Sequence, residues 1–326
     1  MITVKISYPE NNSDFLMKML PKSGYSNDIV YILNPPSDNT KYDYWLVFNF
    51  LPGYFDQQTN CPKENTIFIA IEPLSVKIYP KAFLKQFAHI ISFQGYILNH
   101  FSNAVLSPPL SEWFVGKSHD ELAKIDFVPK SRNISIISSN KINLPGQQKR
   151  LYFALKLKEV FKDKIDLYGR GIQPFDDKWD VLSPYKYSIA IENSFTNNYF
   201  TEKINDCFLA HTLPIYYGCP NLENYFDAES YKRIDINDFN RSKLVIEELV
   251  DDPHYYDNKL NSILNSKKRI LNKYNLFAFV SEFILSLENG NNNILNPVVI
   301  KQKMSYTSEY VSEMFIYKLR KRLKII

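Results

Sequence analysis

Residues 183–220 read SPYKYSIAIENSFTNNYFTEKINDCFLAHTLPIYYGCP, and they hold the clearest strand–helix alternation in the chain. The runs Tyr187–Ile191 and Leu213–Tyr217 are short, apolar and bounded by turn-forming residues, which is typical of buried strands. Between them, a polar loop is predicted over residues 192–200 and a helix over residues 201–210. A strand, a helix and a second strand in this order predict parallel strands joined by a crossover helix, so the stretch indicates an α/β fold.

The same alternation extends in both directions from this stretch. Strands are predicted at residues 29–33, 44–50, 66–71, 89–93, 133–138 and 165–168, and helices at 80–87, 147–161, 241–251 and 254–287. A length of 326 residues is about twice the roughly 150 residues of a common domain. We therefore expect two Rossmann-like α/β lobes with parallel sheets, over residues 1–130 and 131–288. The lobes are expected to face a central cleft, because ligands of such sheets bind beyond the carboxyl ends of the strands.

Composition excludes several classes of protein. Hydrophobic residues make up 45% of the chain and aromatic residues 15%, which suffices for packed cores and argues against disorder. No apolar run reaches the roughly 18 residues that span a bilayer, and the first ten residues lack a secretory pattern. Three scattered cysteines are too few for a disulfide framework. We therefore expect a cytoplasmic location in a reducing compartment.

Positive charge is concentrated at the C-terminal end, where residues 289–326 are predicted to form a polar linker and a basic helical tail. From Pro297 onward the chain has seven Lys and Arg residues and two Glu residues, although its net charge is only +4. Apolar residues recur here at helical spacing, namely Val311, Phe315, Leu319, Leu323 and Ile326. An amphipathic helix over residues 310–326 either binds the inner face of an anionic membrane or packs its apolar stripe on the body. Nucleic-acid binding is disfavoured, because the nearly neutral body has no basic face to extend the patch.

The loop at residues 192–200 leaves a strand end and enters a helix N-terminus, where free N–H groups favour an anion. Its sequence, ENSFTNNYFTEK, and the following LPIYYGCP resemble the donor-sugar motif of the α1,3-fucosyltransferases, glycosyltransferase family ten. Looser similarity places Arg150 at the family's arginine position, in SSNKINLPGQQKRLYFALKL, and Glu72 at its acidic position, in FIAIEPLSVKIYP. One difference is Thr196–Tyr199, where several members have a Gly-Tyr-Gly-Tyr loop, although Asn tolerates left-handed dihedrals.

The resemblance implies a GT-B fold, GDP-fucose as the donor and inversion at the anomeric carbon, without a required cofactor or a catalytic metal. The implied reaction transfers L-fucose to a hydroxyl of an acceptor glycan, such as the 3-OH of GlcNAc or Glc in an oligosaccharide, glycolipid or lipopolysaccharide. The first lobe is expected to bind the acceptor and the second to bind GDP-fucose. Peripheral membrane contact through residues 310–326 would suit lipid-linked acceptors.

Inverting sugar transfer needs a base for the acceptor hydroxyl and positive charge for the leaving diphosphate. The resemblance makes Glu72 the base, and Arg150 and Lys203 the ligands of the diphosphate. Glu202 is a second catalytic candidate, because its carboxylate could bind the donor sugar or lie near the developing cation. The same comparison gives further donor-binding candidates, which are Tyr168, Glu192, Asn193, Ser194, Tyr199 and Thr201.

Simpler roles remain open for these residues. Glu202 can stabilise its helix dipole, Lys203 and Arg150 can be solvated helix residues, and Glu72 can be an exposed strand-end carboxylate. For the whole protein, the alternatives are a glycosyltransferase of the same fold with a different nucleotide sugar and a non-catalytic glycan-binding protein. A metal site is not expected, because Asp176 and Asp177 are adjacent and the five histidines are scattered.

Overall fold

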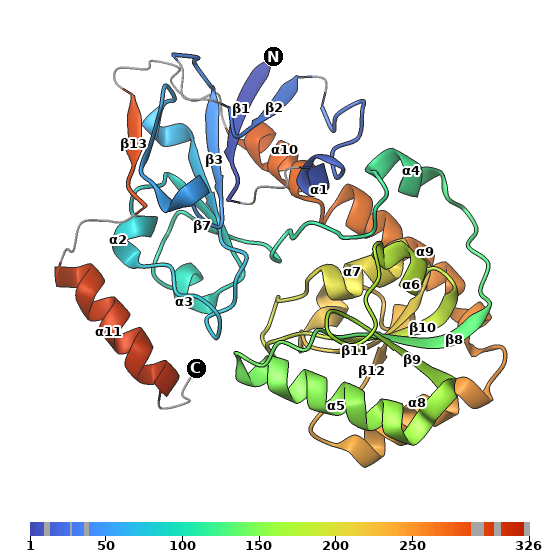
Figure 1. Ribbon diagram of the computed structural model, residues 1–326. Helices are drawn as coiled ribbons and strands as arrows, with labels where there is room; N and C mark the ends of the chain where they lie inside the picture. Colours follow the sequence, from blue (N-terminus) through green and yellow to red (C-terminus); the bar gives the residue numbers. More distant parts are fainter. Residues whose placement is uncertain (10–13, 27, 36–38, 288–296, 303–307, 323–326) are drawn as a thin grey trace. The chain divides into compact units, whose positions relative to one another are not determined.

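The computed structural model describes all residues except 10–13, 27, 36–38, 288–296, 303–307 and 323–326 (Figure 1). The chain forms two compact units, each with its own parallel sheet. Unit 1 comprises Met1–Met17, Lys22–Leu110 and Phe279–Ile326. Unit 2 comprises Lys18–Pro21 and Ser111–Ala278. The alternation of strand and helix patterns in both halves of the sequence therefore predicted the architecture.

The sheet of unit 1 has six parallel strands in the order β2-β1-β3-β5-β6-β7. They are β1 (Ile2–Ser7), β2 (Ile29–Leu33), β3 (Tyr44–Phe48), β5 (Thr66–Ile69), β6 (His89–Ser92) and β7 (Ala104–Leu106). All side chains of β3 and β5 are buried, as expected for central parallel strands that are covered on both faces. The strand order reverses at β1, which has β2 on one side and β3 on the other, so a topological switch point lies there.

Short helices and a second sheet complete unit 1. The helices are α1 (Asp14–Met17), α2 (Lys81–Leu84), α3 (Gly95–Leu98), the second part of α10 (Leu276–Ser286), and α11 (Ser308–Arg322). The second sheet pairs β4 (Gln57–Thr59) with β13 (Val298–Ile300) in antiparallel fashion. Val298 and Ile300 are buried in a core cluster with Trp45 and Phe68 of the main sheet. The C-terminal segment is therefore a structural part of unit 1.

The sheet of unit 2 has five parallel strands in the order β12-β11-β10-β8-β9. They are β8 (Arg132–Ile137), β9 (Ile165–Tyr168), β10 (Tyr185–Ile191), β11 (Leu213–Tyr217) and β12 (Lys232–Arg233). The helices are α4 (His119–Lys124), α5 (Pro145–Phe161), α6 (Lys178–Leu182), α7 (Glu202–Leu209), α8 (Phe239–Asp251) and α9 (Tyr255–Asn272). Gly169 follows β9 with φ of 146°, and a Cβ there would lie 1.8 Å from Ser138 O. Glycine thus allows the ends of β8 and β9 to approach each other.

Five strands were not predicted from the sequence, namely β1, β4, β7, β12 and β13. β1 contains Thr3, Lys5 and Ser7, and the other four are only two or three residues long. Unit 1 ends at Leu110 instead of residue 130, and the chain returns to it at Phe279. The return is explained by contacts within unit 1, because Tyr31 Oη lies 2.8 Å from Ser281 Oγ. The predicted linker, residues 289–296, lies outside the described residues.

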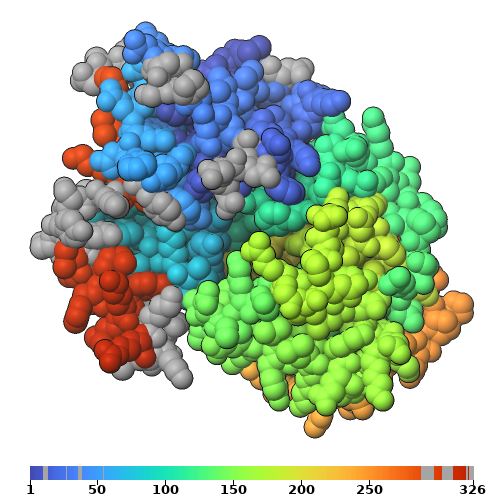
Figure 2. All heavy atoms as spheres, in the orientation of Figure 1, coloured from blue at the N-terminus to red at the C-terminus, as the bar shows by residue number. Residues whose placement is uncertain are grey.

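α11 lies on the surface of unit 1, shown in red in Figures 1 and 2. Tyr317 is buried and donates a hydrogen bond to Val76 O (3.0 Å). Val311, Phe315 and Leu319 are exposed, whereas the predicted Leu323 and Ile326 lie outside the described residues. The alternative in which the apolar stripe packs on the body does not hold for Val311, Phe315 and Leu319, because Tyr317 makes the contact from another face of α11. No helix in the described ranges is both long and apolar enough to cross a membrane.

Candidate functional site

A pocket of about 130 Å³ lies in unit 2 at the carboxyl ends of β8 and β10. Helices α5, α6 and α7 complete its lining, which comprises Ile137, Ser139, Arg150, Lys178, Leu182, residues 188–191, Glu202, Lys203, Asp206 and Cys207. Strand ends and helix N-termini are where parallel α/β sheets bind anionic ligands. The pocket brings together three of the residues predicted from sequence, which are Arg150, Glu202 and Lys203.

Arg150, on the second turn of α5, is buried and incompletely hydrogen-bonded. Its Nη1 donates to Asn193 Oδ1 (2.7 Å) and its Nη2 to Ser139 Oγ (3.3 Å). Its Nε is buried and has no partner among the described residues. Burial lowers the pKa of Arg150, although Glu202 and Glu192 oppose that shift. A buried guanidinium with an unused donor is a favourable place for an anion.

The loop after β10 lies directly against the N-terminus of α5. A Cβ on Gly146, in the first turn of α5, would lie 2.0 Å from Asn193 O. Any other residue at this position would therefore displace either the helix or the loop. The close approach of the loop to α5 brings Asn193 within hydrogen-bond distance of Arg150.

Glu192 directly follows β10, and its buried carboxylate holds the start of α7. Glu192 Oε1 accepts from Thr201 N (2.8 Å), and Oε2 accepts from Thr201 Oγ1 (2.8 Å). Thr201 also caps α7, because its Oγ1 accepts from Lys203 N (3.5 Å). Burial raises the pKa of Glu192, and the Lys203 ammonium, 3.4 Å from Oε2, opposes the rise. These bonds fix the loop to the helix that enters the pocket.

Lys203 is paired with acidic groups on two sides, at 2.9 Å from Glu202 Oε1 and 3.4 Å from Glu192 Oε2. Burial would lower the pKa of Lys203, but these two carboxylates raise it. The pKa of Glu202 falls to about 2 despite burial, because Lys203 and Lys178 are close. Lys178 Nζ in turn lies 2.8 Å from Asp206 Oδ2, and burial raises the pKa of Asp206 to about 6.

The lysine charges that line the pocket have acidic partners within the protein. Three basic groups, Arg150, Lys178 and Lys203, are balanced by Glu192, Glu202 and Asp206, because an unpaired buried charge is costly. Of the three basic side chains, Arg150 has a buried donor, Nε, without a partner in the part of the chain that the structure describes. Within the described part of the chain, no group of three or more His, Cys, Asp or Glu residues could hold a metal ion.

Tyr168, Ser194 and Tyr199 are buried elsewhere in unit 2 and do not line the pocket. Tyr168 Oη lies 2.7 Å from Tyr185 Oη. The tolerance of the loop for Asn is confirmed, because Asn198 has φ of 61°. Its side-chain oxygen accepts from Tyr225 Oη (2.7 Å).

Glu72 lies in unit 1, just after β5, and its backbone is held by buried side chains. Tyr79 Oη accepts from Glu72 N (3.2 Å) and donates to Asn49 Oδ1 (2.6 Å). Gln94 Nε2 donates to Glu72 O (2.6 Å). Lys77 Nζ lies 3.5 Å from Asn49 Oδ1, and burial lowers the pKa of Lys77 to about 8, although Glu72 opposes the shift. Asn49, Glu72 and Gln94 follow β3, β5 and β6, so all belong to the carboxyl edge of the first sheet.

Several neighbours of the predicted residues were not predicted from the sequence. Ser139 and Gln94 stand just after strands, and that position alone could have suggested them. Tyr79 is indistinguishable in the sequence from a core aromatic residue. Lys178 contacts Asp206, which lies 28 residues further along the sequence, and a local sequence pattern does not predict such a pair.

Two α/β units, each with a parallel sheet, are typical of the GT-B fold, and solved structures agree. A structure of an α1,3-fucosyltransferase with GDP-fucose has a TM-score of 0.52 over 85% of this chain and 92% of that chain, at 18% identity. A glycosyltransferase from Rickettsia africae has a TM-score of 0.51 over 88% of this chain and 99% of that chain, at 11% identity. The expected GT-B fold is confirmed.

Residues 128–259 match the family model described as glycosyltransferase family 10 (fucosyltransferase), C-terminal. An α-(1,3)-fucosyltransferase, FucT, of Helicobacter pylori is 33% identical over 89 residues, which are 27% of this chain and 17% of that protein. The mouse 4-galactosyl-N-acetylglucosaminide 3-α-L-fucosyltransferase 9 is 39% identical over 82 residues, 24% of this chain and 22% of that protein. The chain thus matches less than a quarter of either relative. The resemblance is confirmed for this region, which contains every residue that lines the unit 2 pocket.

Proposed function

We propose that this protein is a fucosyltransferase that transfers L-fucose from GDP-fucose to a glycan hydroxyl, with inversion at the anomeric carbon. The observation that carries the proposal is the buried Arg150 guanidinium, which lines the strand-end pocket and whose Nε donor has no partner among the described residues. An anion satisfies such a donor, and a sugar-linked diphosphate is an anion of suitable geometry for arginine. The fucosyltransferase relatives support fucose as the transferred sugar.

In this proposal, the pocket of unit 2 binds the donor. Arg150 binds the diphosphate, and Asn193 orients the guanidinium through its hydrogen bond. Lys203 adds positive charge for the leaving group, while Glu192 and Thr201 hold it in place. Glu202 accepts hydrogen bonds from donor hydroxyls. Tyr168, Ser194 and Tyr199 support the surrounding sheet edge and loop from their buried positions.

Glu72 is the proposed base. The acceptor oxygen forms a bond to the anomeric carbon, the bond from that carbon to the diphosphate breaks, and the acceptor proton passes to the Glu72 carboxylate. GDP leaves with the bonding electron pair, so the charges of the reaction balance. General bases of this kind contribute roughly 10²–10⁴-fold in rate. The reaction is proposed to need no cofactor and no catalytic metal, because positive side chains stabilise the leaving group.

The proposed acceptor is an oligosaccharide or a lipid-linked glycan such as lipopolysaccharide, fucosylated at the 3-OH of GlcNAc or Glc. We also propose that α11 contacts an anionic membrane on its cytoplasmic face. Val311, Phe315 and Leu319 are exposed beside the exposed cations Lys318 and Arg320, which suits an interfacial helix.

A donor panel tests the proposal. The full chain is incubated with N-acetyllactosamine and, separately, GDP-fucose, GDP-mannose, UDP-galactose or UDP-GlcNAc, and both nucleotide release and product mass are measured. We expect turnover with GDP-fucose and a product heavier by one deoxyhexose. Turnover with a UDP-sugar alone would instead indicate a different donor, and binding of glycans without any turnover would indicate a non-catalytic protein.

A further inference from the structure

Two side chains of α11 hold the loop at residues 73–81, which directly follows the proposed base. Tyr317 Oη donates to Val76 O (3.0 Å), and Glu313 Oε2 accepts from Lys81 N (2.8 Å). These bonds join residues that are 241 and 232 positions apart in the sequence, and all four residues belong to unit 1. The helix at the C-terminal end of the chain is therefore attached to the catalytic edge of the first sheet.

Glu313 satisfies a backbone group at the start of α2. The first N–H groups of a helix have no partner within the helix. α2 begins at Lys81, and Pro80, at its N-cap, makes no side-chain hydrogen bond to the helix. Lys81 N donates instead to the Glu313 carboxylate, and a hydrogen bond to an ionised acceptor is stronger than a neutral one. Glu313 thus fixes the end of the loop where the chain enters α2.

Tyr317 fixes the turn with which the loop begins. Val76 N and Lys77 N both donate to Pro73 O (2.9 Å each), so the backbone folds back just after the proposed base. The Tyr317 side chain is 8% exposed, and its hydroxyl donates to the Val76 carbonyl of this turn. The loop is therefore bonded to α11 both at its turn and at its last residue.

The loop in turn holds the proposed base. Tyr79 Oη accepts from Glu72 N (3.2 Å) and from Ile71 N (3.3 Å). The Lys77 ammonium lies 4.1 Å from the centroid of the Phe50 ring and interacts electrostatically with Glu72. Lys77 and Tyr79 both stand between the two loop residues that α11 holds. A shift of the loop would therefore move both the cation and the hydroxyl that act on Glu72.

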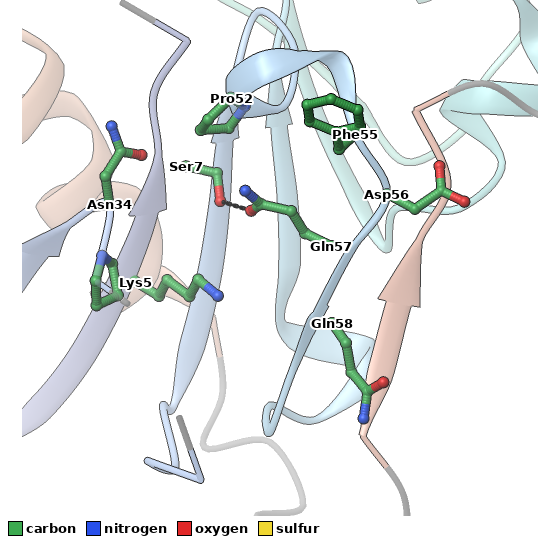
Figure 3. Close-up of a pocket in the computed structure, with 9 residues that line it drawn as sticks. Lys5, Ser7, Asn34, Pro52, Phe55, Asp56, Gln57 and Gln58 are labelled. Atoms are coloured by element: carbon green, nitrogen blue, oxygen red, sulfur yellow. Dashed lines mark hydrogen bonds between the residues drawn. The ribbon is translucent and has the colours of Figure 1, made fainter. Parts of the chain in front are cut away.

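The chain reaches α11 from β13, which is fixed on β4. Figure 3 shows Asp56 and Gln58 next to β13, and Val299 lies opposite Gln58 in the register. Gln302 N donates to Asp56 Oδ1 (2.8 Å), and Gln302 Oε1 accepts from Leu51 N (2.7 Å). A tethered helix needs few contacts to dock, because the tether keeps its effective concentration high. The two bonds to the loop are therefore sufficient to hold α11 there.

We propose that Glu313 and Tyr317 are positioning residues for the proposed base, so that docked α11 sustains the rate of transfer. The inference rests on the proposed function, because it takes Glu72 as the base. The two residues act through the loop at 73–81. They should therefore affect kcat and leave the affinity for GDP unchanged, since the donor pocket lies in unit 2.

Hydrogen–deuterium exchange on the full chain, read by mass spectrometry, tests whether α11 holds the loop. Glu313→Ala should make the amides of residues 73–81 exchange about fivefold faster, the equivalent of one hydrogen bond. Glu313→Gln should keep the protection, because its amide oxygen can still accept from Lys81 N. Ile316→Ala is the matched control, since Ile316 lies on the same helix and is 48% exposed.

Initial rates with GDP-fucose and N-acetyllactosamine test whether the loop positions the base. Glu313→Ala and Tyr317→Phe should each lower kcat roughly three- to tenfold, with the KM for GDP-fucose unchanged. Removal of residues 308–326 should lower kcat at least as much. Glu313→Gln and Ile316→Ala should keep the unmodified rate. A merely structural role would lower the free energy of unfolding and leave kcat unchanged.

Unchanged exchange at residues 73–81 after the removal of α11 would overturn the inference. Faster exchange with an unchanged kcat would overturn it as well, because the loop would then not position the base. The exchange measurement needs no turnover, so it separates this inference from the proposed function. Exchange that depends on Glu313, in a chain that transfers no fucose, would support the attachment of α11 to the loop and contradict the proposed function.

Discussion

Arg150 Nη1 lies 2.7 Å from Asn193 Oδ1, and this hydrogen bond joins α5 to the loop that follows β10. The contact therefore connects two segments of unit 2 that resemble the fucosyltransferases. The resemblance is strong in the loop after β10 and weaker in the segment that contains Arg150. It also holds a buried guanidinium whose Nε is unused by the described residues. The donor site proposed for unit 2 depends on this arrangement.

Asn193→Ala should weaken GDP binding about tenfold, because a hydrogen bond to a charged group contributes roughly 1.5–3 kcal/mol. Arg150 would remain in the pocket but would lose its orientation. Calorimetry measures the effect, and Asn237→Ala, which removes an exposed amide of the same unit, is the control. Equal GDP affinities for Asn193→Ala and the unmodified chain would show that Asn193 has no part in donor binding.

Glu72→Gln should reduce the rate of fucose transfer by about 10²–10⁴-fold, because an amide cannot accept the acceptor proton. The affinity for GDP should stay unchanged, since Glu72 lies in unit 1 and the donor pocket in unit 2. Initial rates with saturating GDP-fucose measure the effect. Transfer within threefold of the unmodified rate would exclude Glu72 as the base.

Tyr79→Phe should lower the free energy of unfolding by about 1–3 kcal/mol, because the buried Asn49 and the half-buried backbone N–H of Glu72 both lose a hydrogen-bond partner. It should also lower kcat more than it raises KM, since the backbone of Glu72 loses a constraint. Urea unfolding and steady-state kinetics measure the two effects. Tyr152→Phe is the control, because Tyr152 is 69% exposed in unit 2. A loss of stability with an unchanged kcat would show that Tyr79 has a structural role and does not position Glu72 for catalysis.

His211 should make stability depend on pH. Burial and the nearby Lys267 and Lys130 lower its pKa to about 3 from 6.5, and Lys267 Nζ lies 2.9 Å from its Nε2. The unfolded chain therefore binds more protons than the folded chain between these values. The free energy of unfolding therefore has its full value above pH 6.5. It decreases as the pH falls toward 3, by up to ~1.4 kcal/mol per pH unit.

His211→Gln should flatten this dependence in urea unfolding at pH 4.5 to 7. The raised pKa of Asp206 contributes a slope of opposite sign, but it does so in both proteins, so their difference isolates His211. Parallel curves for the two proteins would show that His211 titrates normally in the folded state.

Two truncations separate the structural and membrane roles of the C-terminal segment. Removal of residues 297–326 deletes β13 and should lower the free energy of unfolding by about 3–6 kcal/mol. The core cluster of unit 1 then loses the buried side chains of Val298 and Ile300. Removal of residues 308–326 deletes only α11 and should leave the fold intact. If α11 binds membranes, this shorter truncation also abolishes co-sedimentation with anionic vesicles. Retained co-sedimentation would contradict the membrane proposal.

The apolar runs of the sequence were sufficient to predict most central strands, because those strands are buried on both faces. β1 was missed because Lys5 and Ser7 interrupt its apolar pattern while lying buried against Thr59 and Trp45. The position of β13 was equally unpredictable, since its pairing with β4 joins segments that are far apart in the sequence, as in Val298 opposite Thr59.

The candidate site in unit 2 was likewise predicted only in part from the sequence. The motif at residues 192–203 predicted the loop and the helix start, and Arg150 joins them as expected. The pairing of Lys203 with Glu192 depends on how the loop folds back onto the helix. The spacing of these residues in the sequence does not predict this pairing. Tyr168 was predicted to bind the donor from the resemblance to the family, and in the structure its hydroxyl contacts Tyr185. Its role in donor binding remains a prediction.

Calorimetry of GDP and UDP binding, with Arg150→Ala and the neighbouring exposed control Lys149→Ala, is the sharpest test of the donor site in unit 2. We expect the unmodified chain to bind GDP more tightly than UDP, and Lys149→Ala to do the same. Arg150→Ala should bind GDP at least tenfold more weakly, because a buried charged partner of the diphosphate is lost. Equal GDP affinities for Arg150→Ala and Lys149→Ala would contradict the donor site.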